Sequence, residues 1–89
     1  MKHWNKKFLL SNIQDRIYEL ITEEDFATAD DRDDFQDYTE SGTGLLVSNS
    51  GQISLDPKIY SAVVSKKALD RIHIPVNLIL QSKQPEGIQ

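Results

Sequence analysis

The stretch "LLVSNSGQISLDP" (residues 45–57) sets the fold class, because the hydrophobic pattern of the chain changes its period here. Residues 45–48 and 53–55 are predicted as two short strands, and the turn of Asn, Ser, Gly and Gln between them is typical of a β-hairpin. Asp56 can then cap a helix whose first residue is Pro57, a position where the missing N–H group does no harm. The stretch therefore predicts a hairpin that leads directly into a helix.

On the C-terminal side of this stretch, a helical pattern is followed by an alternating one. Four apolar side chains in residues 57–72 recur at helical spacing: Ile59, Tyr60, Val63 and Val64. Because Ser65 can cap a new helix, the segment is predicted to form either one helix or two short ones. Pro75 ends it, and a third strand is predicted after Pro75 from the alternation of Val76, Leu78 and Leu80 with Asn77, Ile79 and Gln81.

On the N-terminal side, residues 11–14 (Ser-Asn-Ile-Gln) fit a capping box, which predicts a helix from Asn12 to about Ile21. The apolar face of this helix is formed by Ile13, Ile17, Leu20 and Ile21. Residues 8–10 (Phe-Leu-Leu) are either a preceding helical turn or an apolar lead-in that packs on the helix.

The segment that follows offers a further cap at Thr22, and the acidic residues 23–25 behind it favour the positive end of a helix dipole. Phe35 and Tyr38 lie three residues apart, which predicts a short helix that ends near Gly42. Four like charges crowd together in residues 29–34, and this repulsion disfavours helix at that point.

Together these patterns predict an α+β fold: an N-terminal helix or helices, then a small antiparallel sheet of about three strands with a crossing helix. Eighty-nine residues leave room for one core, so we expect a single domain over residues 1–84 and a flexible C-terminal tail over residues 85–89. Because a core of this size is marginal, a homodimer stays open as an alternative.

The net charge of −4 is unevenly distributed along the chain. Residues 23–40 hold nine carboxylates and one basic residue, Arg32, whereas the segments on both sides are mildly basic. The N-terminal "MKHWNKKFLL" has an apolar patch too short for a signal peptide, and no stretch approaches a membrane span. With no cysteine in the chain, disulfides and thiolate sites are excluded, and we expect a cytoplasmic protein without membrane contact.

The residue patterns of metal and catalytic sites are not met. An EF-hand loop fails in every register of the acidic segment, because the glycine and the fifth-position ligand are missing. His3 and His73 lack ligand spacing, no serine lies in a G-x-S-x-G elbow, and Gly42-Thr43-Gly44 lacks the lysine of a phosphate loop. We therefore expect no enzyme, no metal and no cofactor.

The acidic segment leads to the main functional hypothesis. Aromatic residues ringed by carboxylates suit docking on a basic protein surface, with burial giving affinity and charge giving fast encounter. We expect a bacterial or phage inhibitor or modulator that imitates a nucleic acid, in an immunity, anti-restriction or anti-CRISPR-like role. The expected contact residues are Asp30, Asp31, Asp33, Asp34, Phe35, Asp37, Tyr38 and Glu40. The plain alternative is a solvated face that only maintains solubility.

Two other functions stay open. Residues 50–63, "SGQISLDPKIYSAV", resemble the strand–hinge–helix unit of AbrB-type swapped-hairpin regulators and antitoxins, which implies a dimeric regulator. Its DNA contacts would come from the basic helix over residues 57–72, through Lys58, Lys66, Lys67 and Arg71, although the overall acidity argues against direct nucleic-acid binding. The second is a structural subunit of a larger complex.

Overall fold

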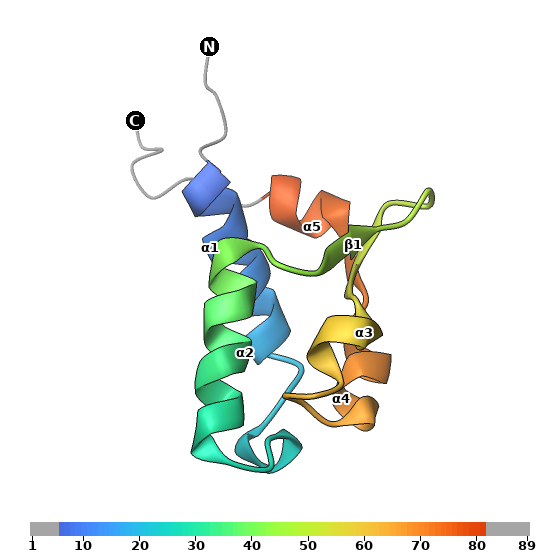
Figure 1. Cartoon of the computed structure of the whole chain (residues 1–89). Coiled ribbons are helices and arrows are strands. Elements are labelled where there is room, and N and C mark those ends of the chain that lie inside the picture. Colours follow the sequence, from blue (N-terminus) through green and yellow to red (C-terminus); the bar gives the residue numbers. More distant parts are fainter. Residues whose placement is uncertain (1–5, 82–89) are drawn as a thin grey trace.

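The computed structural model describes residues 6–81, in which two N-terminal helices pack side by side next to a small sheet and three short helices (Figure 1). The elements, in chain order, are α1 (Lys6–Tyr18), η1 (Glu23–Asp25), α2 (Ala29–Ser41), β1 (Leu45–Val47), β2 (Gln52–Leu55), α3 (Pro57–Tyr60), α4 (Lys66–Arg71), β3 (Ile74–Pro75) and α5 (Val76–Leu80). The predicted α+β class is confirmed. The tail expected over residues 85–89 lies outside the described residues.

Helix α1 begins earlier than the sequence predicted. It starts at Lys6 rather than Asn12, so the capping box proposed at Ser11 is wrong and that residue lies inside the helix. The reason is burial, because three apolar residues at helical spacing pack on the core: Leu9, Ile13 and Ile17. The helix ends at Tyr18 instead of Ile21, although Ile21 still reaches the core from the loop.

Helix α2 is longer than predicted and spans Ala29–Ser41. Two of the crowded aspartates, Asp30 and Asp31, lie in its first turn, where the helix dipole favours negative charge. The Thr28 hydroxyl caps this end by accepting from the Asp31 backbone N–H at 3.0 Å. The expectation that like charges disfavour helix in residues 29–34 is therefore wrong, whereas the predicted end at Gly42, with φ of +82°, is confirmed.

One buried aromatic residue and one polar link hold α1 and α2 together. Phe35 of α2 is completely buried between them and the rest of the chain. Its ring makes edge contacts, with centroids 5.2–6.0 Å apart, to the rings of Tyr18, Phe26 and Tyr60. Gln14 on α1 donates through Nε2 to the Oγ1 of buried Thr39 on α2 at 2.9 Å.

The predicted hairpin is confirmed. Strand β1 pairs antiparallel with β2, so that Leu45 lies opposite Leu55 and Val47 lies opposite Ile53. Gly44 leads into β1 with φ of +72°, and a Cβ atom at this position would lie 2.6 Å from the ring of Tyr60. Only glycine fits there, because both the backbone conformation and the close approach exclude a side chain.

A third strand exists, but it precedes the predicted one. Strand β3 pairs antiparallel with β2, with Ile74 opposite Ile53 and Pro75 opposite Gln52. Because β2 begins at Gln52, the chain beyond Pro75 has no strand to pair with, and residues 76–80 form helix α5. The strand predicted for these residues is therefore wrong.

The segment between β2 and β3 forms two short helices, as one of the two alternatives predicted. Asp56 caps α3 by accepting from the Lys58 backbone N–H at 2.9 Å, with Pro57 as the first helical residue. The Ser65 hydroxyl caps α4 by accepting from the Ala68 N–H at 3.2 Å. The predicted crossing helix is thus a pair of separately capped helices.

Replacing Phe35 with alanine is expected to lower the free energy of unfolding by about 3–5 kcal/mol, because the change leaves a cavity where four aromatic rings meet. Urea denaturation followed by circular dichroism measures this loss. As a control, Val47→Ala changes a side chain that is 64% exposed, and we expect a change within about 0.5 kcal/mol. Similar values for both variants would contradict the central position of Phe35.

Candidate functional site

The exposed side of α2 carries a line of four carboxylates, called here the α2 acidic row: Asp30, Asp33, Asp37 and Glu40. Their spacing of three, four and three residues places them on one side of the helix. Phe35 and Thr39 lie on the opposite side and are buried. The packing of Phe35 therefore fixes the rotation of α2 and directs the acidic row to solvent.

The remaining predicted contact residues differ in position. Asp34 is exposed beside the row, and Asp31 is half-buried in the first turn of the helix. Tyr38 is half-buried, with its ring 5.8 Å from that of Tyr60. Phe35 has no exposed surface, so its expected role as a docking anchor is corrected to that of a core residue.

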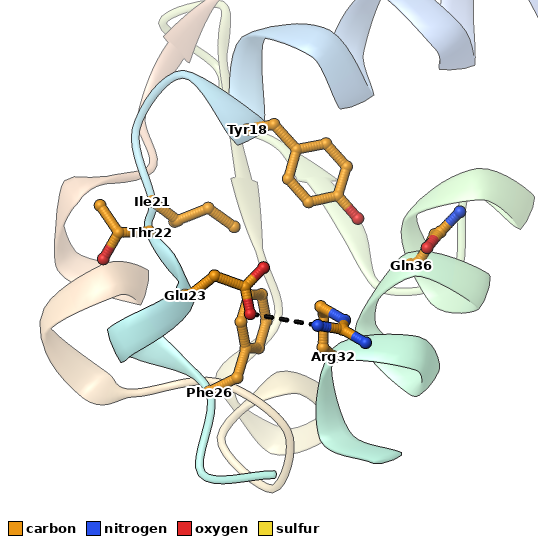
Figure 2. Close-up of a pocket in the computed structure, with 7 residues that line it drawn as sticks. All are labelled: Tyr18, Ile21, Thr22, Glu23, Phe26, Arg32 and Gln36. Carbon is orange, nitrogen blue, oxygen red and sulfur yellow. Dashed lines mark hydrogen bonds and ion pairs between the residues drawn. The ribbon is translucent and has the colours of Figure 1, made fainter. Parts of the chain in front are cut away.

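Arg32, the single basic residue of the acidic segment, lies at an open pocket of about 380 Å³ (Figure 2). Its Nη1 is 3.2 Å from Oε1 of Glu23, and its Nε is 3.7 Å from Oδ1 of Asp33. Figure 2 shows the Glu23–Arg32 pair and the ring of Tyr18 at the pocket, which Phe26 also lines. Because Arg32 lies close to two carboxylates, its charge is paired, and both polar and apolar side chains line the pocket.

Asp25 is withdrawn from the acidic surface. Its Oδ1 accepts hydrogen bonds from the Ser65 hydroxyl at 2.9 Å and from Nη2 of Arg71 at 3.0 Å, and its Oδ2 accepts from the Thr22 N–H at 2.9 Å. Arg71 also donates to the carbonyl of Leu20. Burial alone would raise the pKa of Asp25, but the three hydrogen bonds and the guanidinium charge together hold that pKa below its usual value.

The basic residues proposed to contact DNA do not share one helix. They are divided between α3 and α4, which are capped separately. Arg71 is exposed but is engaged by Asp25 and by the carbonyl of Leu20. The three lysines of the segment are also exposed and form no ion pair within the described residues: Lys58, Lys66 and Lys67. A continuous basic helix over residues 57–72 is therefore absent.

Within residues 6–81, no group of three or more His, Cys, Asp or Glu side chains is placed to hold a metal ion. His73 is exposed just beyond the end of α4, and His3 lies outside the described residues. In the same part of the chain, no helix has the length and hydrophobicity needed to cross a membrane.

The pairing of Asp25 with Arg71 was missed at the level of sequence. The spacing of Thr22 and Asp25 gives a local sign of it, because an acidic residue three positions after a threonine can return a hydrogen bond to the capping residue. Arg71 lies 46 residues further along the chain, and no local pattern connects it to Asp25.

Comparison of the chain with protein-family models, with curated proteins and with solved structures gives no match. The geometry of the described residues is therefore the basis for the function considered next.

The substitution Asp25→Asn is expected to lower the free energy of unfolding by about 1–3 kcal/mol at pH 7, because a charge-assisted pair is lost and a buried donor is introduced. Asp37→Asn, on the exposed acidic row, is the matched control and should change the free energy of unfolding by less than about 0.5 kcal/mol.

The difference between wild type and Asp25→Asn should also depend on pH. Because folding lowers the pKa of Asp25, its carboxylate stabilises the fold at any pH above its pKa in the unfolded chain, and this contribution is lost as the pH falls through its pKa in the folded protein. Denaturation curves between pH 7 and pH 2 should therefore converge for the two proteins at the acidic end. A gap that stays constant down to pH 2 would contradict the lowered pKa.

Proposed function

We propose that the protein binds a basic surface of another protein through the α2 acidic row, and that it thereby inhibits or modulates a nucleic-acid-binding partner. One observation carries the proposal: the four carboxylates of the row lie on one exposed side of a well-anchored helix. In the described residues, Asp30, Asp37 and Glu40 form no ion pair with a basic side chain. Their charge is therefore available to a partner.

The rigidity of α2 supports the proposal. The helix is capped by Thr28 at one end and by Gly42 at the other, and buried Phe35 and Thr39 anchor its inner side. A charged row on a fixed helix loses little conformational entropy when a partner binds, which favours affinity. A solvated loop with the same charges would have to be ordered first.

The spacing of the row supports imitation of a nucleic-acid backbone. From Asp30 to Glu40 the helix rises about 15 Å at 1.5 Å per residue, so the four charges follow one another at intervals of about 5 Å. One strand of double-stranded DNA carries a phosphate about every 3.4 Å along its axis. A groove lined with lysine and arginine would therefore meet a similar line of negative charge, with Asp34 beside it.

The structure removes one of the two aromatic anchors that the sequence suggested for docking. With Phe35 buried, charge rather than aromatic anchoring supplies most of the contact, and the half-buried Tyr38 is the one aromatic candidate left on α2. Contacts dominated by charge give fast association that weakens as salt increases.

The double substitution Asp33→Lys with Asp37→Lys tests the proposal by reversing the charge at the centre of the row. Tagged wild-type protein should recover a basic nucleic-acid-binding protein from a lysate of the host, and the variant should recover at least about tenfold less, because like charges now face each other. Added DNA or RNA should compete with the protein for the recovered partner.

The matched control is Asp15→Lys with Asp70→Lys, which makes the same change of net charge at exposed sites on α1 and α4. This control should recover as much partner as wild type. Equal loss in both variants would indicate a general effect of net charge and would argue against a defined role for α2.

The protein alone is expected not to retard DNA in a gel-shift titration at low or moderate salt, because its net charge is −4 and Arg71 is already engaged. Retardation that weakens as salt increases would instead favour the regulator or antitoxin alternative. Wild type and Lys66→Glu should behave alike in this assay.

A further inference from the structure

The three-stranded sheet has two edges of different character. At one edge, β3 ends in Pro75 and the chain turns into α5, after the Val76 N–H has donated to the Gly51 carbonyl at 2.8 Å. A proline and a turn away from the sheet are devices that prevent further strand pairing. Strand β1 forms the other edge of the sheet and has no such protection. Residues 41–55 contain no proline and no charged residue.

The backbone of β1 directs hydrogen-bonding groups away from the sheet. The Ser48 N–H donates to the Gln52 carbonyl at 2.9 Å. In an antiparallel pair every second residue directs its backbone N–H and C=O toward the partner strand, so this bond fixes which residues of β1 do so. Leu46, two residues earlier, therefore also directs its backbone groups toward β2. The N–H and C=O groups of Leu45 and Val47 point outward, and the Leu45 N–H has only a long contact of 3.5 Å with the carbonyl of residue 42.

The side chains at this edge are apolar and partly uncovered. Leu46 is 44% exposed and Val47 is 64% exposed. Val47 lies on the same side of the sheet as its cross-strand partner Ile53, which is buried, so the core side of the sheet continues to this open edge. Strand β1 thus combines outward backbone groups with apolar surface, the two features that strand addition uses.

We infer that β1 pairs antiparallel with β1 of a second copy of the chain, about a two-fold axis at Leu46. In this register Leu45 of each copy faces Val47 of the other, and both outward groups of each residue find a partner. The two Leu46 side chains face each other at a closely spaced position of the ladder. In this register the outward N–H and C=O groups of Leu45 and Val47 are all paired with those of the second copy, so the short strand needs no longer partner.

Charge is consistent with a second copy as the occupant. The contact itself is neutral, and α2 with its acidic row lies on the other side of the molecule from the hairpin (Figure 1). Two acidic chains can therefore meet through β1 without bringing their acidic rows together. The contact is small, so we expect a weak dimer, as is typical of interfaces under about 1,200 Å².

A cysteine substitution at the two-fold axis tests the register, because the natural chain contains no cysteine. In full-length Leu46→Cys, the two sulfur atoms face each other across a pair of Cα atoms about 4.5 Å apart, which suits a disulfide. In Val47→Cys, the same atoms are separated by roughly 8 Å, which exceeds the reach of a disulfide. Oxidation by glutathione disulfide, which is reduced to two glutathione molecules as the cysteines join, followed by non-reducing electrophoresis, gives the rate of dimer formation for each variant.

The expected result is that Leu46→Cys forms a linked dimer at least about tenfold faster than Val47→Cys, because pairing holds its sulfurs within reach. Random collision would favour the reverse, since Val47 is the more exposed position. Equal rates, or faster linkage of Val47→Cys, would overturn the inference.

Sedimentation equilibrium supplies a second measurement that needs no cysteine. The wild-type chain should show a mass that rises with concentration, and Leu46→Lys should remain a monomer because two like charges would face each other at the axis. Asn49→Lys, with the same charge change in the exposed turn, should dimerise like wild type. If the wild-type chain is still a monomer at millimolar concentration, the inference of self-pairing is overturned. A strand of another protein would then be the candidate partner of the β1 edge.

Discussion

The buried carboxylate of Asp25 joins the two N-terminal helices to the part of the fold that contains α3 and α4. It receives hydrogen bonds from Thr22 in its own turn and from Ser65 and Arg71 on the far side of the chain, and its backbone carbonyl also accepts from the Ser65 N–H at 2.8 Å. The loop between α1 and α2 is thereby fixed to the turn between α3 and α4. A buried charge with all of these partners stabilises one relative position of the two parts, and removing one partner would leave the charge unsatisfied.

The burial of Phe35 has a second, separate consequence. Because its ring is enclosed by three other aromatic rings, α2 has one possible rotation about its own axis. That rotation carries Asp30, Asp33, Asp37 and Glu40 to solvent, so the core and the charged surface are set by the same contact. An aromatic residue that suggested a binding anchor in the sequence is thus the reason why the face that carries the carboxylates is directed to solvent.

The structure tolerates the acidic segment by dividing its charges. Asp25 pairs with Arg71, and Glu23 and Asp33 lie close to Arg32. Asp30 and Asp31 lie at the positive end of the helix dipole. The charges that remain are exposed, where water screens their repulsion. The fold therefore keeps a line of negative charge at its surface at moderate cost in stability, which is the condition that charge-based docking requires.

Local chemistry was enough to predict the Asp56-Pro57 helix start, the Ser65 cap and the Gly42 end of α2, because each depends on residues within about four positions. The hairpin was predicted from its turn residues and from the short strand patterns on both sides of the turn. Four other features depend on which distant surfaces meet: the start of α1, the replacement of the last predicted strand by α5, the burial of Phe35 and the Asp25–Arg71 pair. Residues 76–80 alternate like a strand, yet they form a helix, because β2 begins at Gln52, opposite Pro75, and offers no strand residue before it to pair with. Turn and cap signals act at short range, whereas burial and pairing are properties of the assembled chain.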